Sequence, residues 1–130
     1  MAIRIVRLGS PRRPGEGPRV GTVRRPPRGV PKKDFGRRDF YDVWLPELSP
    51  SAELVALAQG EPWTAKRWAA FARRYRREMN AATPQRLLML FASLSKTANL
   101  SVGCYCPDEE RCHRSLLRDM LKEKGALIGK

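Results

Sequence analysis

The sequence lacks any run of about 18 apolar residues, and this absence excludes a membrane-spanning helix. Its first eight residues alternate arginine with apolar side chains and lack the long apolar core of a signal peptide. The chain has three cysteines, whereas a secreted disulfide framework normally uses an even number. Free or metal-bound thiols in a reducing compartment fit this count better. We therefore expect a cytoplasmic protein without a membrane partner.

Acidic residues are scarce in the N-terminal third of the chain. Residues 1–38 contain twelve arginines and lysines against only Glu16 and Asp34, so their net charge is +10. The remaining residues, 39–130, carry the other +3 of the total of +13. A solvated basic face is one interpretation. Attraction to a polyanion is the other, which makes nucleic acid a candidate partner of this basic third.

Apolar periodicity predicts a single small α/β domain spanning residues 1–130. It should contain a short, mostly parallel sheet with helices packed on it. Residues 12–18 and 31–39 are rich in proline, glycine or charge and are predicted loops. The predicted strands are 3–8, 19–23 and 100–104, with 40–45 as a strand or anchored loop and 126–128 as a further candidate; the predicted helices are 49–60, 64–79, 83–99 and 108–124.

Helix starts are indicated by capping residues and prolines. Ser49-Pro50 and Thr83-Pro84 each combine a capping side chain with a proline suited to the first helical position. Thr64 is the predicted cap of the intervening helix, and acidic residues place the last helix start near Asp108. Helix 83–99 is apolar over a wide arc and is predicted to be well buried; that arc consists of Leu87, Leu88, Leu90, Phe91 and Leu94.

The segment between the second strand and residue 31 is predicted to be stiff and extended. Pro26, Pro27 and Pro31 exclude both helix and central strand there. The segment would therefore display Arg24, Arg25 and Arg28, of which Arg24 and Arg28 are the predicted ligand-binding residues.

The strongest candidate site is residues 104–114, which contain all three cysteines and the only histidine. Cys104 and Cys106 are two residues apart on an extended segment, so their side chains should point to the same side. At helical spacing, His113 falls at the centre of the buried stripe of the last helix and should face the end of the preceding strand. Ligands bind at such strand ends in open α/β sheets.

Three interpretations of this stretch remain open. In the first, Cys112 is a catalytic thiolate assisted by His113 and Arg114, and no cofactor is needed. Its substrate would be a small anionic or nucleotide-like ligand, held by Arg24, Arg28, Cys104 and Cys106. In the second, Cys104, Cys106, Cys112 and His113 bind zinc or iron, although the spacing departs from usual metal motifs. In the third, the thiols and the imidazole are packed core groups.

Three blocks of residues share their order and spacing with a known family. The first block is Arg19 to Gly29. The second consists of two segments that each begin with a tryptophan, residues 44–54 and 68–75. The third is Cys104-x-Cys106 followed by Cys112-His113-Arg114. With these blocks the chain resembles the domain of unknown function 488 (DUF488) family, which includes the YeaO-like proteins. The resemblance implies a compact α/β fold and a pocket between the two arginine-containing blocks, but no particular reaction. Val23 and Pro26 replace an aspartate and a tryptophan of the family pattern.

Overall fold

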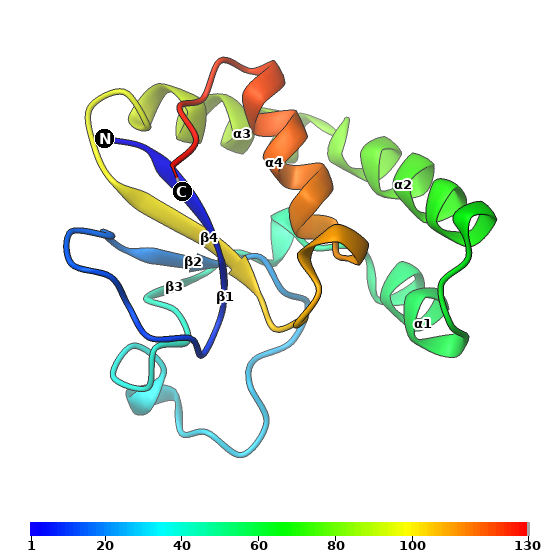
Figure 1. Ribbon diagram of the computed structural model, residues 1–130, viewed down its shortest axis with the longest axis horizontal. Helices are drawn as coiled ribbons and strands as arrows, with labels where there is room; N and C mark the ends of the chain where they lie inside the picture. The colour runs from blue at the N-terminus through cyan, green and yellow to red at the C-terminus, as the bar shows by residue number, and fades with distance from the viewer. Residues whose placement is uncertain (130) are drawn as a thin grey trace.

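Four strands form one sheet at the centre of the structure (Figure 1). The computed structural model describes residues 1–129. Within them the strand order is β1-β4-β2-β3, and every neighbouring pair is parallel. This arrangement confirms the predicted α/β class. The strands are β1 (Ile3–Arg7), β2 (Arg19–Gly21), β3 (Val43–Trp44) and β4 (Leu100–Cys104).

Strand β4 lies between β1 and β2, and all five of its residues are buried. The register pairs Val102 with both Ile5 of β1 and Val20 of β2. Because the strands are parallel, their carboxyl ends meet at one edge of the sheet. Backbone hydrogen bonds continue past the strands there, from the Leu8 amide to the Cys104 carbonyl at 2.8 Å and from the Thr22 amide to the Gly103 carbonyl at 2.9 Å.

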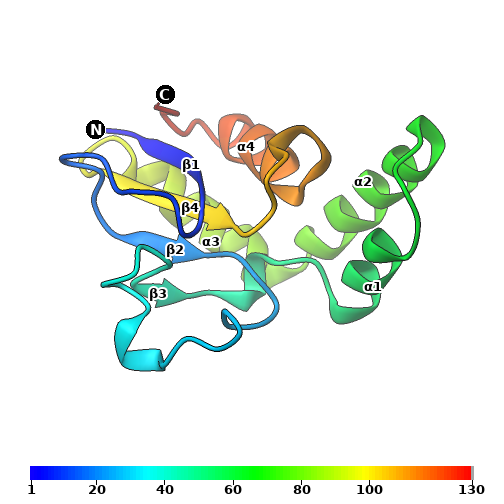
Figure 2. The ribbon, with the colours of Figure 1, turned by 60° about the horizontal axis from the view of Figure 1, so that its bottom comes forward.

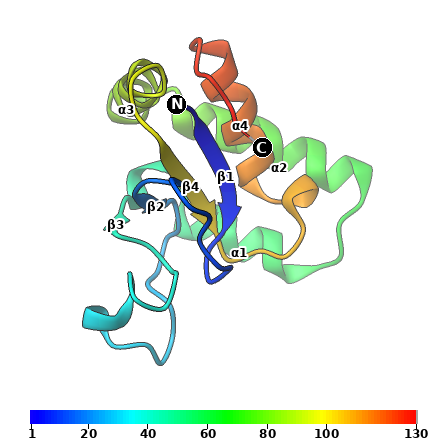
Figure 3. The same ribbon diagram turned by 60° about the vertical axis from the view of Figure 1, so that its left-hand side comes forward.

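The helices pack together on one face of this sheet (Figures 2 and 3). None of the described helices is both long and apolar enough to cross a membrane. A second, smaller hydrophobic cluster lies at the carboxyl end of β4. It consists of Leu8, Val23, Tyr41, Cys104 and Cys112. The helices are α1 (Ala52–Gly60), α2 (Ala65–Met79), α3 (Ala82–Leu94) and α4 (His113–Glu123).

Thr64 caps α2 as predicted, through a hydrogen bond from the Arg67 amide. The prediction for α1 was wrong by two residues, because Ser51 is its cap and accepts a hydrogen bond from the Leu54 amide at 3.2 Å. Glu78 of α2 determines this choice, since its carboxylate accepts from both the amide and the hydroxyl of Ser51. A tertiary contact has therefore selected between two serines that look equivalent in the sequence.

The predicted bounds of the last two helices were also wrong. Helix α3 begins after Ala81, so Thr83 and Pro84 lie in its first turn, where a missing proline N–H costs nothing. It ends at Leu94, before the predicted stop. Asp108 caps a separate 3-10 turn, Glu109–Arg111, by accepting from the Glu110 amide, and α4 starts later, at His113. The delayed start leaves Cys112 at the N-terminal boundary of α4.

Helix α3 is less buried than its apolar arc predicted. Leu88 is fully buried, but Leu90 and Leu94 keep 51% and 39% of their surface exposed. The helix packs against α4 and the turn that precedes α1, and these neighbours cover only one side of it. The C-terminal segment after α4 returns to the sheet, where Ile128 forms an isolated parallel bridge with Ile3. The segment that follows α4 therefore lies beside β1 (Figure 1).

Replacing Tyr75 with phenylalanine is expected to lower the free energy of unfolding by about 1–2 kcal/mol. Tyr75 is fully buried in α2, and its hydroxyl donates to the Leu48 carbonyl at 2.6 Å, so the variant leaves that carbonyl without its partner. Urea unfolding would measure the loss. Tyr105→Phe is the matched control: it removes an exposed hydrogen bond to the Arg25 carbonyl and should cost less. Equal losses in the two variants would contradict the prediction.

Candidate functional site

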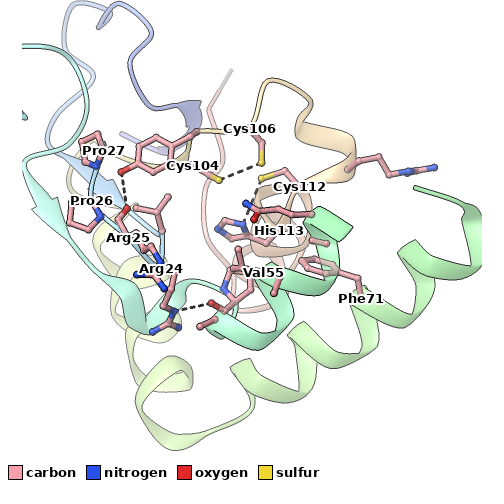
Figure 4. Close-up of a pocket in the computed structure, with 18 of the residues that line it drawn as sticks. Arg24, Arg25, Pro26, Pro27, Val55, Phe71, Cys104, Cys106, Cys112 and His113 are labelled. Atoms are coloured by element: carbon pink, nitrogen blue, oxygen red, sulfur yellow. Dashed lines mark hydrogen bonds between the residues drawn. The ribbon is translucent and has the colours of Figure 1, made fainter. Parts of the chain in front are cut away.

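Three sulfur atoms gather where β4 ends and α4 begins (Figure 4). Cys104 is the last residue of β4, Cys106 follows two residues later, and Cys112 immediately precedes α4. All three Sγ atoms lie within 4.8 Å of one another. The Cys104 and Cys106 sulfurs are 3.8 Å apart, so their side chains do lie on the same side of the chain. The end of β4 and the start of α4 therefore bring the three thiols into one compact cluster.

The thiol cluster lies in the wall of a pocket with a volume of about 890 Å³. Residues 24–28 form part of the opposite wall, with Val55 of α1 and Phe71 of α2 nearby (Figure 4). Cys104 and Cys112 are only 7% and 3% exposed, whereas Cys106 is exposed. Cys106 is therefore the thiol that a ligand entering this pocket can reach most readily.

The His113 ring is held in one orientation by Thr22. Its Nε2 atom lies 2.7 Å from the Thr22 carbonyl oxygen and 3.2 Å from the Thr22 hydroxyl oxygen. That hydroxyl donates its own hydrogen to the Gly103 carbonyl, so both Thr22 oxygens can only accept from the ring. We therefore assign the proton to Nε2. This leaves Nδ1, which is 3.7 Å from the Cys112 sulfur, as the atom that can accept a proton from the thiol.

Arg114 brings a buried positive charge to the loop that holds Cys106. It is 3% exposed, and its Nη2 atom donates to the Cys106 carbonyl at 2.6 Å. No carboxylate among residues 1–129 forms an ion pair with Arg114. An uncompensated buried charge is unfavourable. A thiolate at Cys106 would compensate this charge.

The cluster favours the ionised form of Cys106. Hydrogen bonds from the thiols of Cys104 and Cys112 lower the pKa of Cys106 to about 3, although partial burial opposes the shift. The positive charges of Arg114 and Arg7 lower it further. Cys104 has the opposite shift: its pKa is raised because its proton is held by the hydrogen bond to Cys106. These shifts favour ionisation of Cys106, the exposed thiol, over ionisation of Cys104.

The pKa of Cys112 is also lowered, first by a hydrogen bond from Cys104 and then by His113. The Cys112 sulfur lies within 4.8 Å of the Cys106 sulfur and 3.7 Å from the imidazole Nδ1 atom. The ring of His113 is in turn packed edge-on against Tyr75, with 5.5 Å between centroids. This packing holds the imidazole beside the Cys112 sulfur.

Arg24 and Arg28, the two arginines predicted to bind a ligand from the stiff segment, have different surroundings in the structure. The Arg24 guanidinium donates to the carbonyl oxygens of Pro46, Ser49 and Pro50 at 3.0–3.4 Å, and so ties the segment to the start of α1. Arg28 lines the pocket and is exposed, and it is therefore free to meet a ligand. Arg111 also lines the pocket, with its guanidinium 5.4 Å from the ring centroid of Trp68.

Sequence reasoning missed three residues that organise the site. Thr22 orients His113, Arg7 donates to the Tyr105 carbonyl at 3.2 Å, and the Tyr105 hydroxyl donates to the Arg25 carbonyl at 3.0 Å. No spacing in the sequence indicates these pairs, because the partners are 80 to 98 residues apart. The one indication in the sequence is that Arg7 and Thr22 lie near the ends of predicted strands, where a ligand site is expected.

The three cysteines are the described residues that could hold a metal ion. Thiolates suit soft ions such as zinc or iron, so the donor set fits that chemistry. His113, the predicted fourth ligand, directs Nε2 to Thr22 and has Nδ1 3.7 Å from Cys112. The cysteines alone would provide three ligands and leave a fourth position to another donor.

Comparison with known proteins gives one result. A family model described as DUF488-N3a, the active DUF488-N3 subclade, matches residues 3–125. No curated protein and no solved structure matches the chain. The matched range runs from β1 to beyond the end of α4, so it includes the whole thiol cluster with His113 and Arg114.

Proposed function

The chain belongs to the DUF488 family, within the subclade described as active, and from this premise we propose that it is an enzyme with a cysteine nucleophile. The nucleophile is Cys106, and its substrate is a small anionic ligand that enters the pocket. The observation that carries this proposal is the contact of two buried thiols, Cys104 and Cys112, with the exposed Cys106 sulfur, together with the buried Arg114, which forms no ion pair among the described residues. A thiolate is the reactive form of cysteine, and adjacent positive charge stabilises it.

Cys112, His113 and Arg114 have distinct roles in this proposal. The Cys106 sulfur forms a bond to the electrophilic atom of the ligand, and the leaving group departs with the electron pair of the broken bond. In its protonated form, Cys112 can supply a proton to that leaving group, because its sulfur lies within 4.8 Å of the Cys106 sulfur. His113 Nδ1 can accept a proton from Cys112 in the reverse direction. Arg114 stabilises the Cys106 thiolate and positions its peptide group.

The lining of the pocket supports an anionic, ring-containing ligand. Arg25, Arg28 and Arg111 supply positive charge to its walls, and among residues 1–129 no aspartate or glutamate lines it. Arginine forms paired hydrogen bonds to phosphate and carboxylate groups. Aromatic residues can stack on a flat ring. A nucleotide-like compound combines these features, and its volume suits a pocket of about 890 Å³. The aromatic lining residues are Phe40, Trp63, Phe71 and Tyr105.

Alkylation of Cys106 by iodoacetamide is expected to proceed at nearly the same rate from pH 5 to pH 8. With the pKa of Cys106 at about 3, the thiol is ionised throughout this range. Free cysteine should instead slow several hundred-fold between pH 8 and pH 5, because its thiolate fraction falls with its ordinary pKa of about 8.5. Mass spectrometry of the modified peptide would measure the rate at each pH.

Two cysteine variants serve as controls for this experiment. Cys106→Ser should lose the pH-independent reaction. Cys112→Ala should retain modification at Cys106 but raise the pH of the inflection, because alanine cannot donate the hydrogen bond that the Cys112 thiol provides. A rate at Cys106 that follows the profile of free cysteine would contradict the proposal. Stoichiometric zinc or iron in the purified protein, with alkylation restored only by a chelator, would favour the metal interpretation instead.

A further inference from the structure

We propose that the ligand of the pocket is part of a single-stranded nucleic acid, whose neighbouring phosphates bind the basic segment 25–38. This inference rests on the proposed function for the chemistry at Cys106 and names the class of substrate delivered to it. It starts from the position of the basic segment, which forms a pocket wall at residues 25–28 and then continues outward. In Figures 1 and 3 this segment projects from the sheet, away from the helices.

Most of the cations of segment 25–38 lie outside the pocket and are exposed. The segment has six arginines or lysines and one acidic residue, Asp34. Within the described part of the chain, Arg37 is the one of these six that pairs with a carboxylate, that of Asp34. The six exposed cations are Arg25, Arg28, Lys32, Lys33, Arg37 and Arg38.

The segment is held in place at both ends, so its cations cannot simply fold back onto the protein. Trp44 donates to the Val23 carbonyl at 2.7 Å, and Tyr105 donates to the Arg25 carbonyl. At the far end Phe35 packs edge-on against Tyr41, with 5.2 Å between ring centroids. Pro26, Pro27 and Pro31 restrict the backbone between these anchors. A row of positive charges therefore leads directly into the thiol pocket.

A free nucleotide would use only part of this surface. Its phosphates can be neutralised by Arg25, Arg28 and Arg111, which line the pocket. Lys32, Lys33 and Arg38 lie beyond it, where they are available to additional phosphates, which a polynucleotide supplies at regular spacing. The aromatic lining also favours a single strand, because a duplex keeps its bases stacked whereas a single strand can place one base against Trp63.

The test uses a fluorescein-labelled single-stranded 12-mer, as DNA and as RNA, titrated with the full chain while anisotropy is recorded. If four phosphates are neutralised, affinity should fall about 50-fold between 50 and 200 mM salt, and removing two contacts should reduce that loss to about 7-fold. The double variant Lys33→Gln/Arg38→Gln removes two exposed cations of the segment. The matched control Lys66→Gln/Arg73→Gln removes one lysine and one arginine exposed on α2 and should behave like the wild type.

A second readout links binding to the pocket. Saturating 12-mer should slow the alkylation of Cys106 by more than tenfold, whereas adenosine monophosphate at the same nucleotide concentration should protect much less. Equal effects of the two double variants, equal affinity for a duplex of the same sequence, or no protection by the 12-mer would each overturn the inference. A flat alkylation profile without such protection would leave the thiolate function intact. Loss of the flat profile would overturn that function whether or not the oligonucleotide binds.

Discussion

Replacing Arg19 with methionine is expected to lower the free energy of unfolding by about 3–5 kcal/mol, the usual cost of leaving a buried charge without its partner. Arg19 and Glu16 are 1% and 3% exposed, and their side chains form a salt bridge with 2.5 Å between Nε and Oε2. The guanidinium also donates to the carbonyls of Ser10 and Asp39 at 2.7 and 2.6 Å. The variant would therefore leave one carboxylate and two carbonyls without these partners beneath the loop that joins β1 to β2.

Urea unfolding at pH 7 would measure this loss, with Arg12→Met as the control. Arg12 makes salt bridges to Asp39 and Asp42, but its side chain is 27% exposed, so water can replace these partners and the loss should be about 1 kcal/mol or less. The double variant Arg19→Met/Glu16→Gln removes both charges and should recover part of the stability. A single Arg19→Met variant that is as stable as Arg12→Met would show that the salt bridge contributes little.

The same pair predicts how stability depends on pH. Burial by itself raises the pKa of Glu16, but the hydrogen bond and charge of Arg19 outweigh burial, and the pKa is lowered from its ordinary value of 4.5. A carboxyl group with a lowered pKa stabilises the fold fully above its unfolded value, and this contribution is lost as pH falls through the folded value. Wild-type stability should therefore decline below about pH 4.5, and the decline should be weaker in the Arg19→Met variant.

The sequence predicted the elements that depend on local patterns. Alternation at residues 3–8 and the apolar run before Cys104 correctly indicated β1 and β4, and the Thr64 cap was confirmed. The candidate site was also visible, because the chain has its three thiols and its histidine within ten residues. Strand geometry then placed Cys104 and Cys106 on one side, where their sulfurs are 3.8 Å apart. Local spacing was sufficient whenever both partners belonged to the same short segment.

Features that depend on distant partners could not be predicted. Ser51 rather than Ser49 caps α1 because Glu78, 27 residues away, binds it. Arg24 lines the pocket, but its hydrogen bonds to three carbonyls near the start of α1 could not be predicted. Likewise, the apolar arc of α3 cannot show which side meets another helix, and Leu90 remains half exposed. In each case the deciding contact joins segments that the sequence separates.

Replacing Arg114 with methionine is expected to move the inflection of the Cys106 alkylation profile upward by about 1–3 pH units, the effect of removing an adjacent opposite charge. Hydrogen bonds from Cys104 and Cys112 lower the pKa of Cys106 most, and the Arg114 charge adds to them. Methionine retains much of the apolar stem of this buried side chain, so the main change is loss of the guanidinium and its 2.6 Å hydrogen bond to the Cys106 carbonyl. Rates measured from pH 4 to pH 8 would show the new inflection.

Two further variants separate the effect of positive charge on the Cys106 thiolate from the structural role of Arg114. Arg114→Lys retains the positive charge and should leave the profile nearly flat, even if it binds the Cys106 carbonyl less well. Arg7→Gln removes an exposed cation that also favours the Cys106 thiolate, and its effect should be smaller because water screens it. The second comparison keeps the test decisive if Arg114→Met does not fold. Unchanged profiles in both Arg114→Met and Arg7→Gln would mean that the neighbouring thiols alone stabilise the thiolate, and the buried arginine would then have only a structural role.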